Sequence, residues 1–575
     1  MAKIFSLFLQ KFTMGSNDIH QTVISSATSR NWKRLRTKGS GRLMSRANKR
    51  LSTRTILPVE YFLNKDNIID IQQFVALCKQ NNYKVENVIY SVGVELLRKT
   101  GILVKPHVQK VLKEYSRIRP VDIDDCRLPA DEFDLLGLIY QCFLLEGEKN
   151  RKGSYYTPWD VARNMTAGLD FSKNRTFFDP CCGSGAFILA LEGAGPSQVF
   201  GCDNDPVAVM AAKINLLLKY KTQSFEPQII CCDYLNKNFK SKYTYIVGNP
   251  PWGAVIFDTK GKPVTTKESF SFFFEKAFGQ LEDDGLMRFL LPESILNVKC
   301  HRNFRQFLLE HCCLKSITRY PGAFSGVQTK FIDIAVSRNG RQDGCGGTLM
   351  NVSENSISRQ VSTASFRLTD NLNFNLLSSD DYHKVRKILS KGKYTLRESI
   401  WALGVITGDN KNKVKNRQGR GMEPIYTGRE IEAYTLKQPT KFIKYERSDF
   451  QQVAKDEIYR ADEKLVYKFI SKNLVFAYDN SRSLFLNSAN ILIPRIPGMS
   501  IKTVLAFLNS ELFKFLYKSL FGEIKILKGN LLELPFPEIT PETDKKLTNL
   551  VNEVLKGNKE AIKEIDEVVS EIFQI

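Results

Sequence analysis

The tetrapeptide Asn249-Pro250-Pro251-Trp252 has the most specific chemical pattern in this sequence of 575 residues. Two successive prolines fix the backbone and remove two N–H donors. The Asn249 side-chain oxygen and the Pro250 carbonyl can then accept from one amino group, and Trp252 offers a flat face to a planar ring. By itself a Pro-Pro pair more often marks a plain turn. Because this pair follows a predicted strand, we expect a site for an exocyclic amino group beside a stacked ring.

A second pattern predicts a crevice that binds a nucleoside. A strand-like run ends at Asp179, and two glycines, Gly183 and Gly185, follow before a predicted helix. Glycines let the backbone approach a ligand closely, and a helix N-terminus offers free N–H groups. Asp203 comes about 20 residues later, where an acidic residue can accept both ribose hydroxyls. Asp233 ends the third strand, where it can accept from the amino group of an adenine ring.

These side chains need a sheet to bring them together. Predicted strands at 176–179, 198–202, 228–232, 243–247 and 286–291 alternate with helical patterns at 186–192, 207–219 and 269–281. This alternation predicts an α/β fold with a doubly wound parallel sheet. Ligands of such sheets bind at the carboxyl ends of the strands. Asp179, Asp203, Asp233 and Asn249 all fall at those ends.

The segments on either side of the predicted sheet differ from it in residue pattern. Residues 58–150 have apolar residues at helical spacing, and residues 338–370 are rich in Gly and Ser, typical of a linker or exposed hairpins. The sequence therefore predicts six segments: a basic N-terminal arm at 1–57, a helical region at 58–150, the α/β domain at 151–345, a linker at 346–384, an α+β domain at 385–540 and a helical tail at 541–575.

Charge and composition narrow the function further. The formal net charge is +22, and the segment 30–54 has ten basic residues and no acidic one. With a second basic run at 411–420, this favours a nucleic acid partner over a merely solvated surface. No apolar stretch approaches the ~18 residues of a membrane span, so we expect a soluble, cytoplasmic protein. Twelve cysteines without a Cys-x-x-Cys pair, and only five scattered histidines, predict reduced thiols and no metal site.

The order of three motifs resembles that of the gamma-class N6-adenine DNA methyltransferases of bacterial restriction–modification systems. The motifs are Tyr155-Tyr156-Thr157-Pro158, Asp179-Pro180-x-x-Gly183-x-Gly185-x-Phe187 and Asn249-Pro250-Pro251-Trp252. The resemblance is strong over about residues 130–340. It continues more weakly through short runs at 404–410, 428–431, 508–510 and 534–537, which look like the target-recognition domain of that family.

This resemblance implies a Rossmann-like methyltransferase sheet, the cofactor S-adenosylmethionine and methyl transfer to N6 of an adenine flipped out of double-stranded DNA. Asp179 and the glycines would lie by the methionine moiety of the cofactor, with Asp203 on its ribose and Asp233 at its adenine. Phe324 would stack on the target base opposite Trp252, although on sequence alone it is more typical of a core residue. The full set of implied cofactor contacts is Tyr156, Thr157, Pro158, Asp179, Pro180, Gly183, Gly185, Phe187, Asp203, Asp233 and Asn249.

Several alternatives stay open on the sequence. Methylation of RNA or of a protein glutamine amide would use similar chemistry. A restriction enzyme with its nuclease in the same chain needs a metal-binding cluster of acidic residues and lysine, and the region 58–150 has no convincing one. A non-catalytic specificity subunit would not need an intact Asn249-Pro250-Pro251-Trp252. We expect a monomer, with a separate restriction endonuclease or defence-complex subunits as possible further partners.

Overall fold

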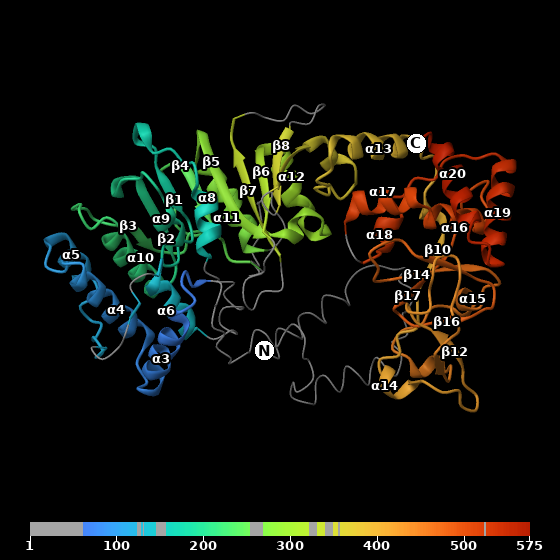
Figure 1. Ribbon diagram of the computed structural model, residues 1–575, viewed down its shortest axis with the longest axis horizontal. Helices are drawn as coiled ribbons and strands as arrows, with labels where there is room; N and C mark the ends of the chain where they lie inside the picture. Colours follow the sequence, from blue (N-terminus) through green and yellow to red (C-terminus); the bar gives the residue numbers. More distant parts are fainter. Residues whose placement is uncertain are drawn as a thin grey trace, which may run out of the picture. The chain divides into compact units, whose positions relative to one another are not determined.

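The computed structural model describes residues 61–123, 128–129, 132–144, 157–252, 268–320, 330–339, 349–354, 357–522 and 525–575. These residues form two compact units, both drawn in Figure 1. The sheet unit ends at Arg386 and also includes Ser519–Gly522, whereas the C-terminal unit comprises Lys387–Lys518 and the chain from residue 525 onward. The predicted basic arm at 1–57 lies outside the described residues.

A nine-stranded sheet forms the centre of the sheet unit, in the order β3-β2-β1-β4-β5-β7-β6-β8-β9. Neighbours from β3 to β5 are parallel, and β7 runs antiparallel between β5 and β6. The strand order reverses between β1 and β4, which is where open α/β sheets bind ligands. The predicted α/β fold is thus confirmed. The strands are β1 (Phe177–Asp179), β2 (Val199–Asp203), β3 (Gln228–Cys231), β4 (Tyr243–Gly248), β5 (Leu281–Pro292), β6 (Cys313–Arg319), β7 (Phe331–Ser337), β8 (Leu349–Glu354) and β9 (Ile357–Ser362).

Both faces of this sheet are covered by helices. Successive residues of a strand point to opposite faces, and in β1 both Phe177 and Phe178 are buried, each in a different hydrophobic cluster. Burial on both faces explains why the first strands read as continuous apolar runs. The helices of the Phe177 cluster are α8 (Trp159–Thr166), α9 (Ala186–Ala190) and α10 (Pro206–Lys219), and those of the Phe178 cluster are α11 (Ser269–Gly279) and α12 (Arg302–His311).

The helical region before the sheet belongs to the same unit. In its described part it forms α3 (Asn67–Gln80), α4 (Val85–Lys99), α5 (Pro106–Lys113) and α6 (Leu135–Phe143). These helices share one hydrophobic cluster with α10. Where α4 meets α10, a Cβ added to Gly93 would lie 2.6 Å from Ile214 Cδ1, so a larger residue at position 93 would have to displace the end of the Ile214 side chain.

The segment 346–384 differs from the expected linker. Strands β8 and β9 form an antiparallel hairpin, and β8 pairs in parallel with β6 of the main sheet. Val352 and Val361 of this hairpin are buried in the Phe178 cluster. The hydroxyls of Ser353 and Ser358 are 2.7 Å apart on its exposed side. The serines that suggested a linker therefore belong to the solvent-facing side of a hairpin that extends the sheet.

The C-terminal unit is α+β, as predicted. It contains two four-stranded sheets, ordered β10-β17-β14-β15 and β11-β13-β12-β16. The first sheet consists of β10 (Ile400–Leu403), β17 (Ala489–Ile493), β14 (Lys464–Lys468) and β15 (Phe476–Asp479). The second consists of β11 (Val414–Lys415), β13 (Lys441–Ile443), β12 (Glu423–Tyr426) and β16 (Leu484–Phe485).

Helices pack against these two sheets and complete the chain. The expected tail at 541–575 joins the C-terminal unit, because the Asp544 carboxylate accepts from the Ser500 N–H (2.8 Å) just before α16 begins. Across the described residues, no helix has both the length and the apolar character needed to cross a membrane. The helices from residue 379 onward are α13 (Ser379–Ser390), α14 (Asn410–Lys413), α15 (Asp456–Tyr459), α16 (Ile501–Asn509), α17 (Glu511–Phe521), α18 (Lys528–Leu531), α19 (Pro541–Leu555) and α20 (Ala561–Phe573).

Candidate functional site

The glycine turn, residues 180–185, connects β1 to α9. Gly183 and Gly185 both adopt positive φ angles, 55° and 97°, which glycine reaches without steric cost. The Gly183 N–H donates to Asp203 Oδ2 (2.9 Å), and the Cys182 N–H donates to the Cys202 carbonyl (2.9 Å). The turn is thus tied to the end of the neighbouring strand β2.

Asp179, at the end of β1, is only 1% exposed. Its Oδ1 accepts from the Cys181 N–H (3.0 Å), whereas Oδ2 has no hydrogen-bond partner among the described residues. Burial, together with the nearby charge of Asp203, raises the pKa of Asp179 to about 8. Because an unsatisfied buried oxygen is costly, this carboxyl fits a ligand that brings a cationic N–H donor, such as the ammonium group of a methionine moiety.

Asp203 ends β2 beside the glycine turn. Its Oδ1 accepts from the Asp205 N–H (2.9 Å) and its Oδ2 from Gly183, and burial raises the pKa of this carboxyl. A carboxylate has about four acceptor positions. Together with a backbone bond from Asn204, these bonds still leave capacity to accept from a ligand hydroxyl, which fits the predicted ribose contact.

Asp233 begins the loop after β3 and is exposed. Its two oxygens accept from its own loop, from the Leu235 N–H (2.9 Å) and from Asn236 Nδ2 (2.7 Å). Lys276 of α11 anchors the same loop, because its Nζ donates to the carbonyls of Tyr234 (2.5 Å) and Lys237 (2.6 Å). The role of Lys276 could not be predicted from the sequence, since this residue lies about forty positions away in a helix and no local pattern marks it.

The proline ledge, residues 249–252, leaves the end of β4 next to the glycine turn. A Cβ added to Gly248 would lie 3.2 Å from Pro180 Cδ and 3.4 Å from Asp179 Oδ1, so glycine allows the two strand ends to approach. Asn249 Nδ2 donates to Thr157 Oγ1 (3.4 Å), which orients the side-chain amide. The Pro251 carbonyl accepts from Ser269 Oγ (2.5 Å) at the start of α11.

Trp252 is fixed by one polar contact and by packing. Its indole N–H donates to the Leu290 carbonyl of β5 (3.1 Å), and its ring centroid is 6.2 Å from that of Phe331. Phe331 is in turn stacked on Tyr320, with centroids 5.3 Å apart. The predicted stacking residue is thus held at the edge of a row of aromatic rings.

The remaining predicted site residues divide into three groups. Thr157 is buried and contacts Asn249, and Pro158 is the N-cap residue of α8. Phe187 is buried in the Phe177 cluster, where it supports α9 from the core side. Tyr156 and Phe324 lie outside the described residues.

Near its C-terminal end, helix α8, which follows Thr157, is held by residues that no local pattern in the sequence marks. Arg288 of β5 forms an ion pair with the fully buried Asp333 of β7 and donates to the Asn164 carbonyl (3.0 Å). The Tyr320 hydroxyl donates to Asn164 Oδ1 (3.2 Å). A buried ion pair rarely adds much stability, so we interpret this one as a device that fixes α8 on the sheet.

One group of metal-ligand type occurs in the described part of the chain. Ligand atoms of Glu268, Cys300 and His301 lie within 4.8 Å of one another. Burial, and the charge of the nearby Arg305, lower the pKa of His301 to about 4. The same guanidinium charge would repel a dication, so we assign no metal to this group.

The C-terminal unit offers an exposed row of cations. Lys411, Lys415, Arg417 and Arg420 of the predicted basic run are all exposed. Such a row suits the phosphates of a nucleic acid.

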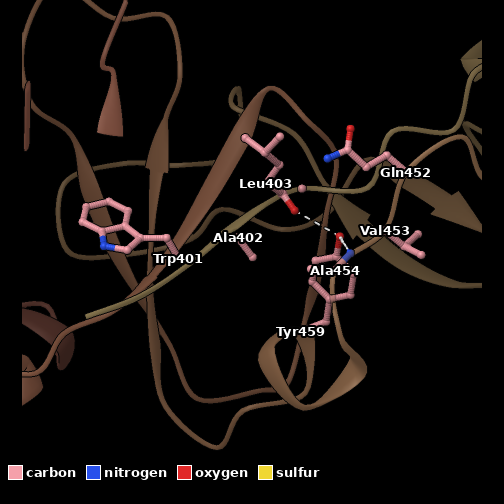
Figure 2. Close-up of a pocket in the computed structure, with 8 residues that line it drawn as sticks. Trp401, Ala402, Leu403, Gln452, Val453, Ala454 and Tyr459 are labelled. Carbon is pink, nitrogen blue, oxygen red and sulfur yellow. Dashed lines mark hydrogen bonds between the residues drawn. The ribbon is translucent and has the colours of Figure 1, made fainter. Parts of the chain in front are cut away.

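The C-terminal unit also contains a cavity of about 260 Å³, shown in Figure 2. The Tyr459 hydroxyl donates to the Leu403 carbonyl (3.0 Å) and accepts from the Ala454 N–H (3.0 Å), so these polar groups of the wall satisfy one another. The cavity is lined by Trp401, Ala402, Leu403, Gly404, Gln452, Val453, Ala454 and Tyr459.

Each of the two units matches a known protein family. Residues 131–371 match the model of the N-6 DNA Methylase family, and residues 423–536 match the TaqI-like C-terminal specificity domain. The Type II methyltransferase M.VspI of Vibrio sp. (strain 343) is 31% identical over 307 residues, which cover 51% of this chain and 74% of that protein. The Type I restriction enzyme MjaVII methylase subunit of Methanocaldococcus jannaschii is 27% identical over 169 residues, only 28% of each chain.

Among solved structures, the Type IIL restriction-modification enzyme MmeI in complex with DNA has a similar fold. The TM-score is 0.53 at 12% sequence identity, and the match covers 77% of this chain and 79% of that one. At this identity the likeness concerns the fold alone, and it extends over much of both chains.

Proposed function

This chain belongs to the N-6 DNA methylase family of restriction–modification DNA methyltransferases, and from that premise we propose how its site works. The methyl group of S-adenosylmethionine is moved to N6 of an adenine that has been rotated out of DNA. The glycine turn, with Asp179, Asp203 and Asp233, holds the methyl donor. The proline ledge, with Asn249, holds the target amino group.

The observation that carries this proposal is the close approach of the two strand ends. The glycine turn follows β1 and the proline ledge follows the adjacent parallel strand β4, with Gly248 packed against Pro180 and Asp179. An acceptor for an amino group therefore lies beside a buried carboxyl that lacks a donor. Positioning of this kind, which brings two reactants together in one orientation, can supply much of the rate enhancement of an enzyme.

On the target side, the chain supplies hydrogen-bond acceptors and a rigid backbone. Asn249 Oδ1 and the Pro250 carbonyl accept from the N6 amino group and draw its lone pair out of conjugation with the ring. The bond from Asn249 Nδ2 to Thr157 holds the amide in the required orientation. When bound, S-adenosylmethionine supplies a methyl group that is already activated by the positive charge on sulfur. Alignment therefore matters more than acid–base catalysis by the protein.

The target base must first leave the duplex, which costs a few kcal/mol of lost stacking and pairing. We propose that Trp252 offsets this cost by stacking, at ~1–3 kcal/mol per base. The contacts of Trp252 with Leu290 and Phe331 hold its indole ring in place, so the ring is fixed before a base stacks on it. Phe324 is proposed for the opposite face of the base, on the strength of the family resemblance alone.

We assign selection of the DNA sequence to the C-terminal unit. The match to a specificity domain and the exposed cations at 411–420 support this assignment. Each cation that neutralises a phosphate contributes ~0.9 to the slope of log affinity against log salt. Replacing Lys411, Lys415, Arg417 and Arg420 by glutamine should therefore flatten that slope by up to about 3.6. In this proposal the chain acts as a monomer in the bacterial cytoplasm, alongside any separate endonuclease of its system.

The test is methyl transfer from S-adenosylmethionine labelled in its methyl group. Unmethylated duplex DNA, structured RNA and glutamine-containing protein are offered in parallel, each with and without magnesium. We expect labelled N6-methyladenine in the duplex DNA only, formed without magnesium. Label in RNA or in glutamine would replace the proposed substrate, and magnesium-dependent cleavage of the DNA would establish a nuclease in the same chain.

A further inference from the structure

Helix α6 of the N-terminal helical region contacts both loops that we assign to the methyl donor. Asp134, the N-cap residue of α6, contacts Ser184 in the glycine turn after β1. Tyr140, in the middle of α6, contacts Asp205 in the loop after β2. These contacts join segments separated by 50 and 65 residues, so they are tertiary and not part of local turns.

The Asp134 carboxylate is the centre of a closed polar network. Its Oδ2 accepts from the Ser184 hydroxyl, and its Oδ1 accepts from the Gly137 N–H (2.8 Å) and from Asn215 Nδ2 (2.8 Å). Asn215 of α10 also donates to the Ser184 carbonyl (2.9 Å). Ser184 is therefore held at both its side chain and its backbone, and the glycines on either side of it are held with it.

Steric fit shows that this contact is close. A Cβ added to Gly137 would overlap both Asp134 Oδ2 and Ser184 Oγ. Gly137 lies in a helix and has no positive φ angle, so conformational freedom does not explain this glycine. Its missing side chain is the space that lets α6 reach the glycine turn.

The second contact fixes the loop after β2. The Tyr140 hydroxyl donates to Asp205 Oδ2 (2.5 Å). Asp205 caps α10 through its Oδ1, and its N–H donates to Asp203 Oδ1 (2.9 Å). Tyr140 is thus linked through Asp205 to the carboxylate of Asp203, which we assign to the ribose.

We infer that Asp134 and Tyr140 are positioning residues for the methyl-donor pocket, acting through Ser184 and Asp205. The N-terminal helical region then holds the two loops of that pocket in position, in addition to forming part of the core of the sheet unit. This inference rests on the proposed function, because it assumes that the two loops bind S-adenosylmethionine. It assigns no contact with the donor to Asp134 or Tyr140 themselves.

Calorimetric binding of S-adenosylmethionine to the full chain tests the inference without any need for turnover. We expect Asp134→Ala to weaken donor binding about tenfold, because it removes the bond that holds the Ser184 hydroxyl, together with the bonds from Gly137 and Asn215 to the same carboxyl. Tyr140→Phe should weaken it by a smaller factor, about threefold to tenfold, because only one hydroxyl is removed. Affinity for DNA in the absence of the donor should stay at the wild-type value in both variants.

A double-mutant cycle separates positioning from general destabilisation. If Asp134 acts through Ser184, the double variant Asp134→Ala/Ser184→Ala should bind the donor no more weakly than the weaker single variant. The matched control is Glu114→Gln, which removes an ion pair with Lys213 (2.7 Å). That pair also joins the helical region to α10, but it touches neither loop, so donor affinity should not change.

Four outcomes would overturn the inference. Additive losses of donor affinity in the cycle would show that Asp134 does not act through Ser184. A loss of donor affinity in Glu114→Gln equal to that in Asp134→Ala would show that the network contributes only to general stability. Wild-type affinity in Asp134→Ala and Tyr140→Phe would remove the positioning role while leaving the proposed function intact. A wild-type chain that does not bind S-adenosylmethionine would overturn both the inference and the proposed function.

Discussion

The glycine turn and the proline ledge lie at adjacent strand ends but are held in place in different ways. The turn is held by hydrogen bonds, from Gly183 to Asp203 (2.9 Å) and from Ser184 to Asp134. The ledge has hydrogen bonds too, from Trp252 to Leu290 and from Ser269 to Pro251. In addition, two prolines stiffen its backbone, and Trp252 packs against both hydrophobic clusters of the sheet. Polar bonds suit a pocket that binds a charged ligand, whereas a stiff backbone suits a ledge whose acceptors must not move.

This difference implies that the two halves can be damaged separately. Substitutions in the ledge should reduce the rate or the binding of the target base and spare donor affinity. Substitutions in the turn should reduce donor affinity and spare DNA binding. Substitutions at Asn249, Trp252, Asp179 and Gly248 test that separation.

Asn249→Ala removes the side-chain acceptor of the ledge. We expect methyl transfer under saturating substrates to fall at least about 100-fold, as when one preorganised hydrogen-bonding group is removed from other active sites. Donor affinity should change by no more than about twofold, because the donor pocket has its own supports. Single-turnover methylation and calorimetry measure the two quantities. Substantial turnover in Asn249→Ala would contradict the mechanism.

Trp252→Ala removes a stacking surface worth ~1–3 kcal/mol, so binding of DNA with an extruded target should weaken roughly 5-fold to 150-fold. Trp252→Phe keeps part of that surface and serves as the control. Fluorescence of 2-aminopurine placed at the target position reports on base rotation. Unchanged fluorescence in Trp252→Ala would show that the base stacks elsewhere.

Asp179 gives the donor side a pH dependence that the ledge lacks. Burial raises the pKa of this carboxyl to about 8, so in the free protein most of it is protonated at pH 7. A ligand ammonium requires the ionised form. Donor binding at pH 7 should therefore release close to one proton, and affinity should rise about tenfold from pH 6 to pH 7.

Asp179→Asn is the control for this titration, and it should abolish both the proton release and the pH dependence. Calorimetry in two buffers of different ionisation enthalpy counts the protons. Because the pKa of Asp179 in the folded protein lies above the ordinary carboxyl value, the folded protein keeps this proton at pH values where the unfolded chain has already lost it. Stability without donor should accordingly fall as pH rises from about 4 to about 8. Proton uptake on binding would contradict the assignment.

Gly248→Ala places a Cβ 3.2 Å from Pro180 and 3.4 Å from Asp179 Oδ1, at the junction of the two halves. We expect a loss of unfolding free energy of about 1 kcal/mol, from mild overpacking. Donor affinity and methylation rate should both fall a few-fold, unlike in the other three variants. Thermal unfolding measures the first effect, and a loss confined to one half would show that the strand ends are not coupled.

Local patterns were sufficient to predict the doubly wound sheet and to place the candidate residues Asp179, Asp203 and Asn249 at the ends of its strands. Asp179, Asp203 and Asn249 were found because they follow strands whose apolar runs are visible in the sequence. In the stretch expected to form a linker or exposed hairpins, the addition of β8 to the main sheet could not be predicted, since its pairing with β6 depends on residues more than 30 positions away. Lys276, Arg288 and Asp134 were missed for the same reason, because each acts on a partner in another element.

The sequence by itself determined which groups this protein offers for chemistry and how stiff their backbone is, because proline, glycine and strand periodicity act within a few residues. Tertiary structure alone decided which of those groups meet, which carboxyl is buried and which helix contacts the glycine turn. The pKa of Asp179 illustrates the division: its residue type is written in the chain, but its burial beside Asp203 exists only after the strands have paired.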